Sequence, residues 1–304
     1  MTLQRDDFNE FFAELHGSAK PFAWQRRLLD AVVDGDGWPE ALVAPTGSGK
    51  TAVIDIHVFA LALAVANDSP LPPRRLAMIV GRRVLVDDQH EHARDAAERL
   101  ARPGDSPVLA EVAKLLWRLQ GTPSEKSTAE SPLLVAKLRG GVPSSRRWVD
   151  HPTAAAVLCA TPDMWGSRLL FRGYGSGRLA RPREAGLLAV DSVAVVDEAH
   201  LARQLLCTAR RVHRLVPVAD RKWQGPAELR VVETTATPRN ATGGVSVEEA
   251  DLDESALLKD RMCRPKPVTL VPNKDWPAGK HARVDQELAR RTVELLDTSG
   301  GGTV

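Results

Sequence analysis

The sequence predicts an α/β fold with a mostly parallel central sheet and helices on both of its faces. Short, mostly apolar runs alternate with longer stretches of helical character, and such runs are typical of strands buried in a parallel sheet. The runs are residues 41–43, 76–80, 133–138, 154–159, 193–196 and 229–233. A glycine-rich turn at 44–51 directly follows the first run and precedes an apolar helical stretch at 52–66. A strand, a tight turn and a helix in this order are typical of α/β proteins that bind phosphate.

The turn at residues 44–51 has the residue types and spacing of a phosphate-binding loop. Gly47 and Gly49 let the backbone curl with its N–H groups facing inward, and the N-terminus of the next helix adds about half a positive charge. Lys50 is predicted to reach the β- and γ-phosphates, and the hydroxyl of Thr51 to ligate Mg²⁺. Ala44 stands where the general pattern has Gly. A turn that serves only the fold is the competing interpretation, and the strand–helix context favours a nucleoside triphosphate site.

Gln25 is expected to extend this site toward the base. It follows aromatic residues and lies one helix before the loop. A glutamine amide can donate to and accept from the edge of adenine at once, so Gln25 is a predicted contact of ATP; a surface glutamine on an amphipathic helix is the alternative. The predicted nucleotide-binding residues are Gln25, Pro45, Thr46, Gly47, Ser48, Gly49, Lys50 and Thr51.

The run at 193–196 ends in Asp197-Glu198-Ala199-His200. Carboxylates at the carboxyl end of a parallel strand face the same rim of the sheet as the loop. Asp197 is the expected Mg²⁺ partner, and Glu198 is placed to orient and deprotonate an attacking water. His200 is assigned to coupling between ATP and nucleic acid rather than to a metal, because no second histidine stands at ligand spacing. The predicted catalytic residues are Lys50, Asp197, Glu198 and His200, and the predicted metal ligands are Thr51 and Asp197.

Basic residues at two other places are candidate nucleic-acid contacts. Arg82 and Arg83 end the run at 76–80, at the rim where ligands bind in open α/β sheets. Thr161 begins a predicted helix that it is placed to cap, and Arg168 and Arg172 lead into a loop rich in arginine, glycine and aromatic residues. Guanidinium groups neutralise phosphate, and aromatic faces stack on bases. Exposed, solvated charged turns are the alternative at both places.

The amino-acid composition limits which classes of protein this chain can belong to. The chain has 304 residues, 43% of them hydrophobic and 26% charged, and a net charge of +2, so nucleic-acid binding depends on local patches rather than on a global field. Its three cysteines stand far apart and indicate neither a zinc ribbon nor a disulfide framework, which fits reduced thiols in the cytoplasm. No signal peptide is indicated, and the longest apolar run, 52–66, is too short and too polar for a membrane span.

Three segments are predicted along the chain: a lead-in helix at 1–20, an ATP-binding lobe at 21–272, and a helix and linker at 273–304. Within the lobe, residues 101–131 are expected to form a surface insertion around a short helix. Residues 139–148 are expected to form a basic loop tipped by Trp148. Residues 243–260 are expected to be irregular, with a last strand at 267–271.

The order of these motifs resembles that of superfamily 2 helicases. The matching positions are Gln25, residues 44–51, Arg82-Arg83, Thr161-Pro162-Asp163, Asp197-Glu198-Ala199-His200 and Thr235-Ala236-Thr237. The Asp-Glu-Ala-His tetrapeptide narrows the resemblance to the DEAH-box members. The resemblance implies a RecA-like P-loop NTPase domain, the first of two such lobes, and it assigns Thr235 and Thr237 to coupling of hydrolysis to movement.

A closer resemblance is to the helicase–nuclease of type I CRISPR systems, most of all to its I-G branch, also called I-U. The segments that carry it are 138–141, 166–171, 173–175, 185–188 and 197–201. This resemblance implies ATP-driven translocation on single-stranded DNA, recruitment by an RNA-guided CRISPR surveillance complex, and contacts of Arg83 and Thr161 with the DNA backbone.

The sequence departs from that family in three ways. Gly81-Arg82-Arg83 replaces the usual Pro-Thr-Arg, and neither a His-Asp dipeptide nor a Gln-x-x-Gly-Arg-x-x-Arg motif occurs. The metal nuclease domain and the second lobe with its arginine finger are therefore expected to be absent from this chain, and we expect it to hydrolyse ATP barely, if at all, by itself. Two alternatives remain open: a module that binds ATP or DNA without turnover, and a DEAH-type RNA helicase or restriction translocase.

Overall fold

The computed structural model describes residues 2–34, 37–121, 131–142, 144–219, 228–235, 244–265 and 281–298. The chain divides into a compact unit, Met1–Cys263, and a second unit, Arg264–Val304, in which helix α12 (His281–Thr298) is described. Helix α12 agrees with the helix expected at the end of the chain. The expected strand at 267–271 and the expected domain boundary at residue 272 lie outside the described residues.

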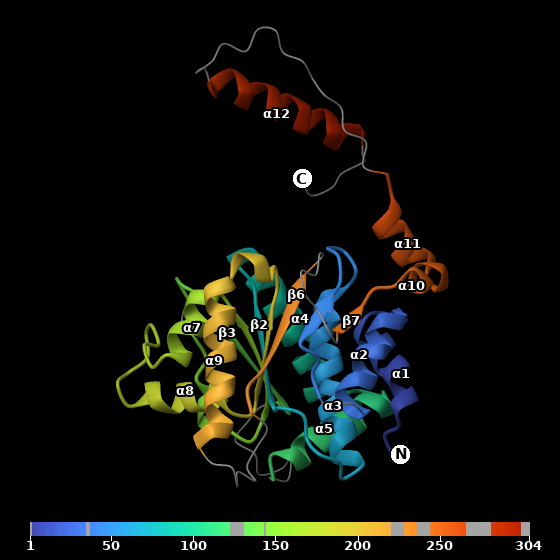
Figure 1. Cartoon of the computed structure of the whole chain (residues 1–304). Helices are drawn as coiled ribbons and strands as arrows, with labels where there is room; N and C mark the ends of the chain where they lie inside the picture. Colours follow the sequence, from blue (N-terminus) through green and yellow to red (C-terminus); the bar gives the residue numbers. More distant parts are fainter. Residues whose placement is uncertain are drawn as a thin grey trace. The chain divides into compact units, whose positions relative to one another are not determined.

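Seven strands of the described chain form one sheet, in the order β3-β4-β2-β5-β6-β1-β7, and each pairing between neighbours is parallel. The strands are β1 (Ala41–Val43), β2 (Arg75–Ile79), β3 (Leu133–Leu138), β4 (Ala155–Ala160), β5 (Ser192–Val196), β6 (Arg230–Thr235) and β7 (Gly244–Ser246). Six of them coincide with the six apolar runs to within two residues at either end. The architecture confirms the predicted α/β fold with a parallel central sheet and helices on both of its faces (Figure 1).

Helices cover both faces of the sheet because strand side chains alternate between them. Met78 and Val157 lie in the core beneath helices α1 to α5, whereas Ile79 and Leu158 lie in the core beneath α6 to α9 (Figure 1). On the first face these are α1 (Phe8–Leu15), α2 (Ala23–Asp34), α3 (Val53–Ala66), α4 (Arg83–Ala101) and α5 (Pro107–Leu119). On the second face they are α6 (Arg147–Asp150), α7 (Pro162–Leu169), α8 (Ala180–Ala189) and α9 (Arg203–Ala219).

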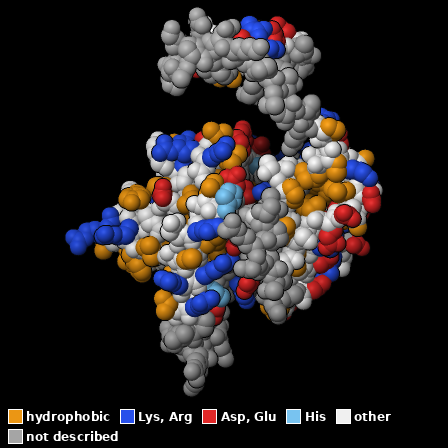
Figure 2. All heavy atoms as spheres, turned by 45° about the horizontal axis from the view of Figure 1, so that its top comes forward, with side chains coloured by type: hydrophobic (Ala, Val, Ile, Leu, Met, Phe, Trp, Pro, Cys, Tyr) orange, Lys and Arg blue, Asp and Glu red, His pale blue; other side chains and the backbone are white. Residues whose placement is uncertain are grey.

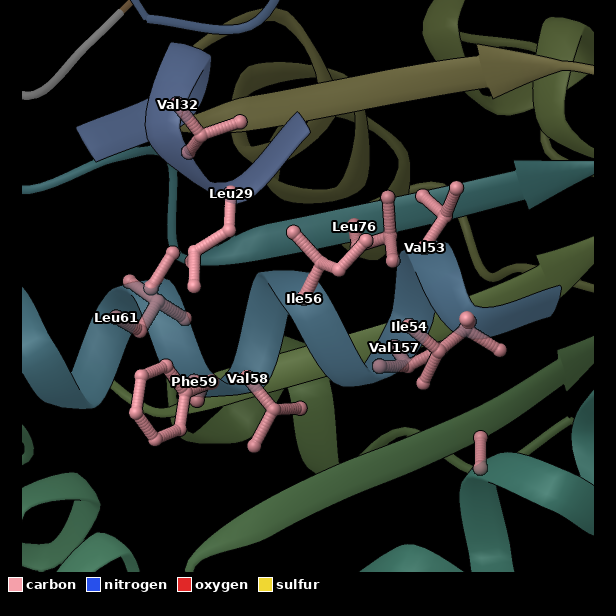
Figure 3. Close-up of a cluster of buried hydrophobic side chains, with 14 of the residues drawn as sticks. Leu29, Val32, Val53, Ile54, Ile56, Val58, Phe59, Leu61, Leu76 and Val157 are labelled. Carbon is pink, nitrogen blue, oxygen red and sulfur yellow. The ribbon is translucent and has the colours of Figure 1, made fainter. Parts of the chain in front are cut away.

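Helix α3 is the centre of the first face. Every residue from Val53 to Ala64 is buried. Figure 3 shows why: Ile56 and Val53 lie toward Leu76 of the sheet, while Leu61 lies near Leu29 of α2. A helix that is apolar all round is buried on all sides. This packing fixes the helix that begins directly after the glycine-rich loop.

The helix expected at 1–20 is present as α1, and its Phe8 and Phe11 pack against Phe59 of α3 within the compact unit. Other expectations about peripheral segments were wrong. Helix α5 lies within the expected surface insertion, yet it packs on α3 with six of its apolar side chains buried, namely Val108, Leu109, Val112, Ala113, Leu115 and Leu116. Trp148 is only 2% exposed and belongs to the second core, so it does not tip a loop.

The stretch at 243–260 is regular rather than irregular. It contains strand β7, helix α10 (Glu249–Glu254) and most of helix α11 (Ala256–Cys263). Arg27 of α2 holds this segment, since its guanidinium donates to both carboxylate oxygens of Asp251 at 2.7 and 2.8 Å. The acidic residues that predicted an irregular segment instead form an ion pair and place negative charge in the first turn of α10, where the helix dipole favours it. In the part of the chain that the structure describes, we find no helix with the length and apolar character needed to cross a bilayer.

Candidate nucleotide site

The glycine-rich loop at 44–51 follows β1 and lies at the carboxyl ends of the parallel strands (Figure 1). Gly47 and Gly49 have φ angles of 87° and 85°, in the left-handed region that glycine adopts without strain. Ser48 between them is fully buried, and its hydroxyl donates to the carbonyl of Pro45 at 2.7 Å. The loop thus has the tight, glycine-dependent curl that the sequence predicts.

Two side chains of α2 donate hydrogen bonds to the backbone of this loop. The indole of Trp24 donates to the carbonyl of Ser48, and the amide of Gln25 donates to the carbonyl of Gly49, both at 3.1 Å. The backbone N–H of Phe22 donates to the Gln25 amide oxygen at 2.8 Å. Gln25 is 1% exposed with both ends of its amide engaged, so the predicted adenine contact does not agree with this structure. Gln25 does lie beside the loop, as its position in the sequence predicts, but its amide stabilises the loop backbone.

Lys50 and Asp197 meet across the carboxyl edge of the sheet. The Lys50 ammonium lies 2.7 Å from Asp197 Oδ1, and the two side chains are 17% and 18% exposed. The same oxygen accepts the hydroxyl of Thr234 at 2.5 Å and the backbone N–H of Glu198 at 3.0 Å. Burial alone raises the pKa of Asp197, but the hydrogen bonds from Lys50 and Thr234 outweigh it and hold this pKa below its usual value. Asp197 is therefore an ionised carboxylate held against the loop.

Glu198 and His200 follow on a short turn beyond β5. Glu198 has a φ of 48°, which is uncommon for a residue with a side chain and concentrates at functional sites. Its side chain lines the cavity described below, which agrees with the predicted position for activating water. His200 is exposed on the 3₁₀ turn Ala199–Leu201. The structure thus separates His200 from the cavity and leaves its coupling role as a prediction.

A cavity of about 360 Å³ opens between the loop and the end of β5. Its lining includes both polar and apolar residues, namely Thr46, Gly47, Gly49, Lys50, Thr51, Val53, Met78, Leu85, Asp88, Gln89, Val195, Asp197, Glu198, Thr234 and Arg261. Of the predicted nucleotide-binding residues, Thr46, Gly47, Gly49, Lys50 and Thr51 are in this lining, whereas Pro45 and Ser48 shape the loop. The volume is that of a small-molecule site.

The donor set of the cavity fits a nucleoside triphosphate with Mg²⁺. Lys50 supplies a cation, the loop supplies backbone N–H groups at a helix start, and the exposed hydroxyl of Thr51 and the carboxylate of Asp197 supply oxygen ligands of the kind that Mg²⁺ takes. The predicted metal ligands therefore lie in one cavity.

Thr234 and Arg261 are among the lining residues that were absent from the predicted site. Thr234, rather than Thr235, donates to Asp197, because adjacent strand residues face opposite sides and the register of β6 against β5 sets which one points to the site. Arg261 of α11 also lines the cavity, although the sequence around it predicts no structure. Thr235 ends β6 and pairs in register with Val43, and Thr237 lies outside the described residues.

The predicted nucleic-acid contacts divide into exposed and buried groups. Arg82 and Arg83 are exposed at the rim after β2, and the Arg83 guanidinium lies against Gly140 in the turn after β3. Thr161 stands at the N-terminal cap position of α7 but is 9% exposed, and its side chain makes no capping hydrogen bond. Arg172 is exposed on the loop after α7. Figure 2 shows Lys and Arg side chains over the side of α7, α8 and α9 on this face.

Arg168 is not available for nucleic acid, which corrects the prediction. It is 3% exposed, its guanidinium donates to the carbonyls of Met164 and Tyr174 at 2.9 and 3.2 Å, and it lies 3.6 Å from Glu184. Trp165, expected in the same basic loop, is fully buried, whereas Phe171 and Tyr174 are 59% and 62% exposed. Arg168 of α7 therefore holds the loop that follows this helix through a hydrogen bond to the loop backbone.

Comparison with known proteins gives a distant structural likeness and no sequence match. No protein-family model matches the chain, and no curated protein matches it significantly. Among solved structures, the chain is similar to the yeast DEAD-box splicing factor Prp28, with 17% sequence identity and a TM-score of 0.43. The match covers 80% of this chain and 50% of that one, so the chain spans half the length of that structure. A likeness of this degree carries no argument about substrate or activity.

Proposed function

We propose that Met1–Cys263 is the ATP-binding motor lobe of a superfamily 2 helicase or translocase, and that it binds ATP with Mg²⁺ in the cavity between the loop and β5. One observation carries the proposal: the 2.7 Å contact of Lys50 with Asp197 inside that cavity. The two residues are distant in sequence, and a phosphate-binding loop and an acidic strand end have to meet for this chemistry.

The residues of the cavity divide the work of binding. Lys50 pairs with Asp197 in the free protein and would turn to the β- and γ-phosphates when a nucleotide enters, because phosphate oxygens offer it more negative charge. Thr234 and the Glu198 N–H then keep Asp197 oriented as a ligand. Bound beside Thr51 and Asp197, Mg²⁺ would neutralise charge on the phosphate oxygens. Glu198 would hold the attacking water and accept its proton.

Movement on single-stranded DNA is the finer part of the proposal. It is supported by the exposed Arg82 and Arg83 at the rim, by Arg172 on the loop after α7, and by the resemblance of the motif order to the CRISPR helicase–nuclease. On this proposal a CRISPR surveillance complex recruits the protein, and a second RecA-like lobe with an arginine finger and a His-Asp nuclease domain complete it. Thr235 and Thr237 would couple hydrolysis to movement between the two lobes.

Calorimetric titration of the 304-residue chain with ATP and Mg²⁺ tests the binding step. We expect binding to the wild type, strong loss with Lys50→Ala, and unchanged binding with Lys114→Ala, whose ammonium is exposed and pairs with Glu111 on α5. Arginine fingers contribute about 10³–10⁵ in rate, so turnover by this chain is expected to be slow. Equal nucleotide affinity of the wild type and Lys50→Ala would refute the site. Anisotropy with labelled single-stranded DNA and RNA of one sequence separates a DNA motor from an RNA helicase.

A further inference from the structure

Three helices bring a buried carboxylate and two imidazoles together, and none of the three residues is in the lining of the nucleotide cavity. His16 caps the C-terminus of α1, Asp55 lies in the first turn of α3, and His92 lies in α4. Asp55 Oδ2 is 2.9 Å from His16 Nε2, and Asp55 Oδ1 is 2.9 Å from His92 Nε2. The three ligand atoms, one from each residue, all lie within 4.8 Å of one another.

Among these three side chains, the carboxylate of Asp55 is unusual because it is fully buried. It lies in a helix that is apolar on every side, and a buried carboxylate requires compensation by positive charge or hydrogen bonds. His16 and His92 supply this compensation, one ring at each oxygen of the carboxylate. Imidazole and carboxylate are both groups that bind zinc in proteins.

The geometry suits a tetrahedral ion. Zinc binds imidazole nitrogen at about 2.0–2.1 Å and carboxylate oxygen at about 2.0–2.2 Å, which places neighbouring ligand atoms about 3.3–3.5 Å apart. The present 2.9 Å contacts are to different oxygens of Asp55, and the three ligand atoms lie within 4.8 Å of one another, so shifts of up to about 1.5 Å bring them to that spacing. His16 and His92 are 27% and 22% exposed, so solvent reaches both side chains.

We propose that His16, Asp55 and His92 form a Zn²⁺ site that joins α1 to α3 and α4. Each imidazole binds the ion through Nε2, and the proton now on that nitrogen moves to Nδ1 or to solvent, so that both rings bind as neutral ligands. Asp55 supplies one carboxylate oxygen, and water completes the tetrahedron. The ion would fasten the N-terminal helix to the helix that follows the phosphate-binding loop, and the site does not depend on ATP binding.

The ring contacts around the site support His16 as a positioned ligand. The His16 imidazole stacks on Phe12 with centroids 4.1 Å apart, and on His92 with centroids 5.3 Å apart. Phe12 is 6% exposed and belongs to the first core, so the ring that orients His16 is itself fixed. Ligands on packed elements bind a metal more strongly than ligands on mobile loops, because less ordering is required.

Cobalt substitution tests the proposal directly. The 304-residue chain, freed of metal with a chelator, is titrated with Co²⁺, whose visible absorption is intense when the ion is tetrahedral. We expect one equivalent to give this spectrum and one equivalent of Zn²⁺ to displace it. At a free zinc concentration 100-fold above the dissociation constant, the midpoint of thermal unfolding should rise by about 5 °C. Absence of the spectrum and of the thermal shift in the wild type would overturn the proposal, whatever the variants do.

Variants then locate the ion. His92→Gln and His16→Gln should each lower the affinity for Co²⁺ and Zn²⁺ at least about tenfold, as should Asp55→Asn. His90→Gln, two residues from His92 on α4, is the matched control and should bind as the wild type does. Cys207→Ser and Asp197→Asn exclude an exposed thiol and the nucleotide cavity as the site. If His16→Gln and His92→Gln fold, as circular dichroism reports, and still give the full spectrum, the ion lies elsewhere and the proposal is wrong.

Discussion

The ammonium of Lys50 lies 2.7 Å from Asp197 Oδ1, so the glycine-rich loop and the acidic end of β5 share one ion pair in the free protein. The pair is mostly buried, and Asp197 Oδ1 also accepts hydrogen bonds from Thr234 and from the Glu198 backbone. Asp197 Oδ1 keeps these two donors when Lys50 moves away, so the cation beside it can be exchanged. We interpret this pair as the nucleotide-free state of the site, in which Lys50 and Asp197 neutralise each other until phosphate and Mg²⁺ replace these contacts.

Lys50→Ala should lower the affinity for MgATP roughly 100-fold, because one charge-assisted interaction with phosphate amounts to about 1.5–3 kcal/mol and 1.4 kcal/mol is tenfold in affinity. The free energy of unfolding should fall by only about 1 kcal/mol, since Thr234 and the Glu198 N–H still satisfy Asp197. Calorimetry and urea denaturation of one preparation measure both quantities. A variant that unfolds instead would show that the pair serves stability rather than binding.

Thr234→Val should weaken MgATP binding about tenfold, because it removes the hydroxyl that orients Asp197 while preserving side-chain volume. Thr235→Val is the neighbouring comparison on the other face of β6 and should leave MgATP affinity near that of the wild type. Fluorescence titration with an ATP analogue reports both. A larger effect of Thr235→Val on affinity would contradict the assignment of Thr234 to the site.

Arg168→Ala should reduce the free energy of unfolding by about 3 kcal/mol, because it leaves the carboxylate of Glu184, 4% exposed, without its cation. Arg172→Ala, on the exposed loop, should change stability by less than about 0.5 kcal/mol. Urea denaturation distinguishes the two. If Arg168→Ala keeps its stability and loses affinity for single-stranded DNA, Arg168 contacts the nucleic acid and does not serve to hold the loop.

Cys159 should resist alkylation in the folded protein. It is fully buried in β4, and burial raises the pKa of its thiol to about 12, despite the opposing charge of Lys137. The thiolate is the reactive form, so N-ethylmaleimide at mildly alkaline pH should modify the exposed Cys207 and Cys263 first. Mass spectrometry of native and denatured samples checks this, with Cys159 labelled only after denaturation. Rapid labelling of native Cys159 would mean that the sheet opens around β4.

Apolar runs predicted six of the described strands, and the glycine spacing predicted the loop, because both signals are local. The misses were all set by tertiary contacts. Arg168 is buried because Glu184, on another helix, lies 3.6 Å away, and the basic composition of its neighbourhood conceals this. The short helix expected within 101–131 is present as α5, but its burial was missed, because the proline and serine that mark its start are also typical of a surface insertion. The pairing of His16 and His92 with Asp55 links three helices and has no signature within any one of them.

The Mg²⁺ dependence of ATP binding in Asp197→Asn tests the central claim most directly. Asparagine keeps the size and one oxygen of Asp197 but removes the charge that both Lys50 and Mg²⁺ require. ATP affinity of the wild type should rise with Mg²⁺, whereas the variant should bind ATP with an affinity that Mg²⁺ no longer increases. An unchanged Mg²⁺ dependence in the variant would mean that Asp197 and Lys50 do not share a magnesium-bound triphosphate, which would contradict the proposed function.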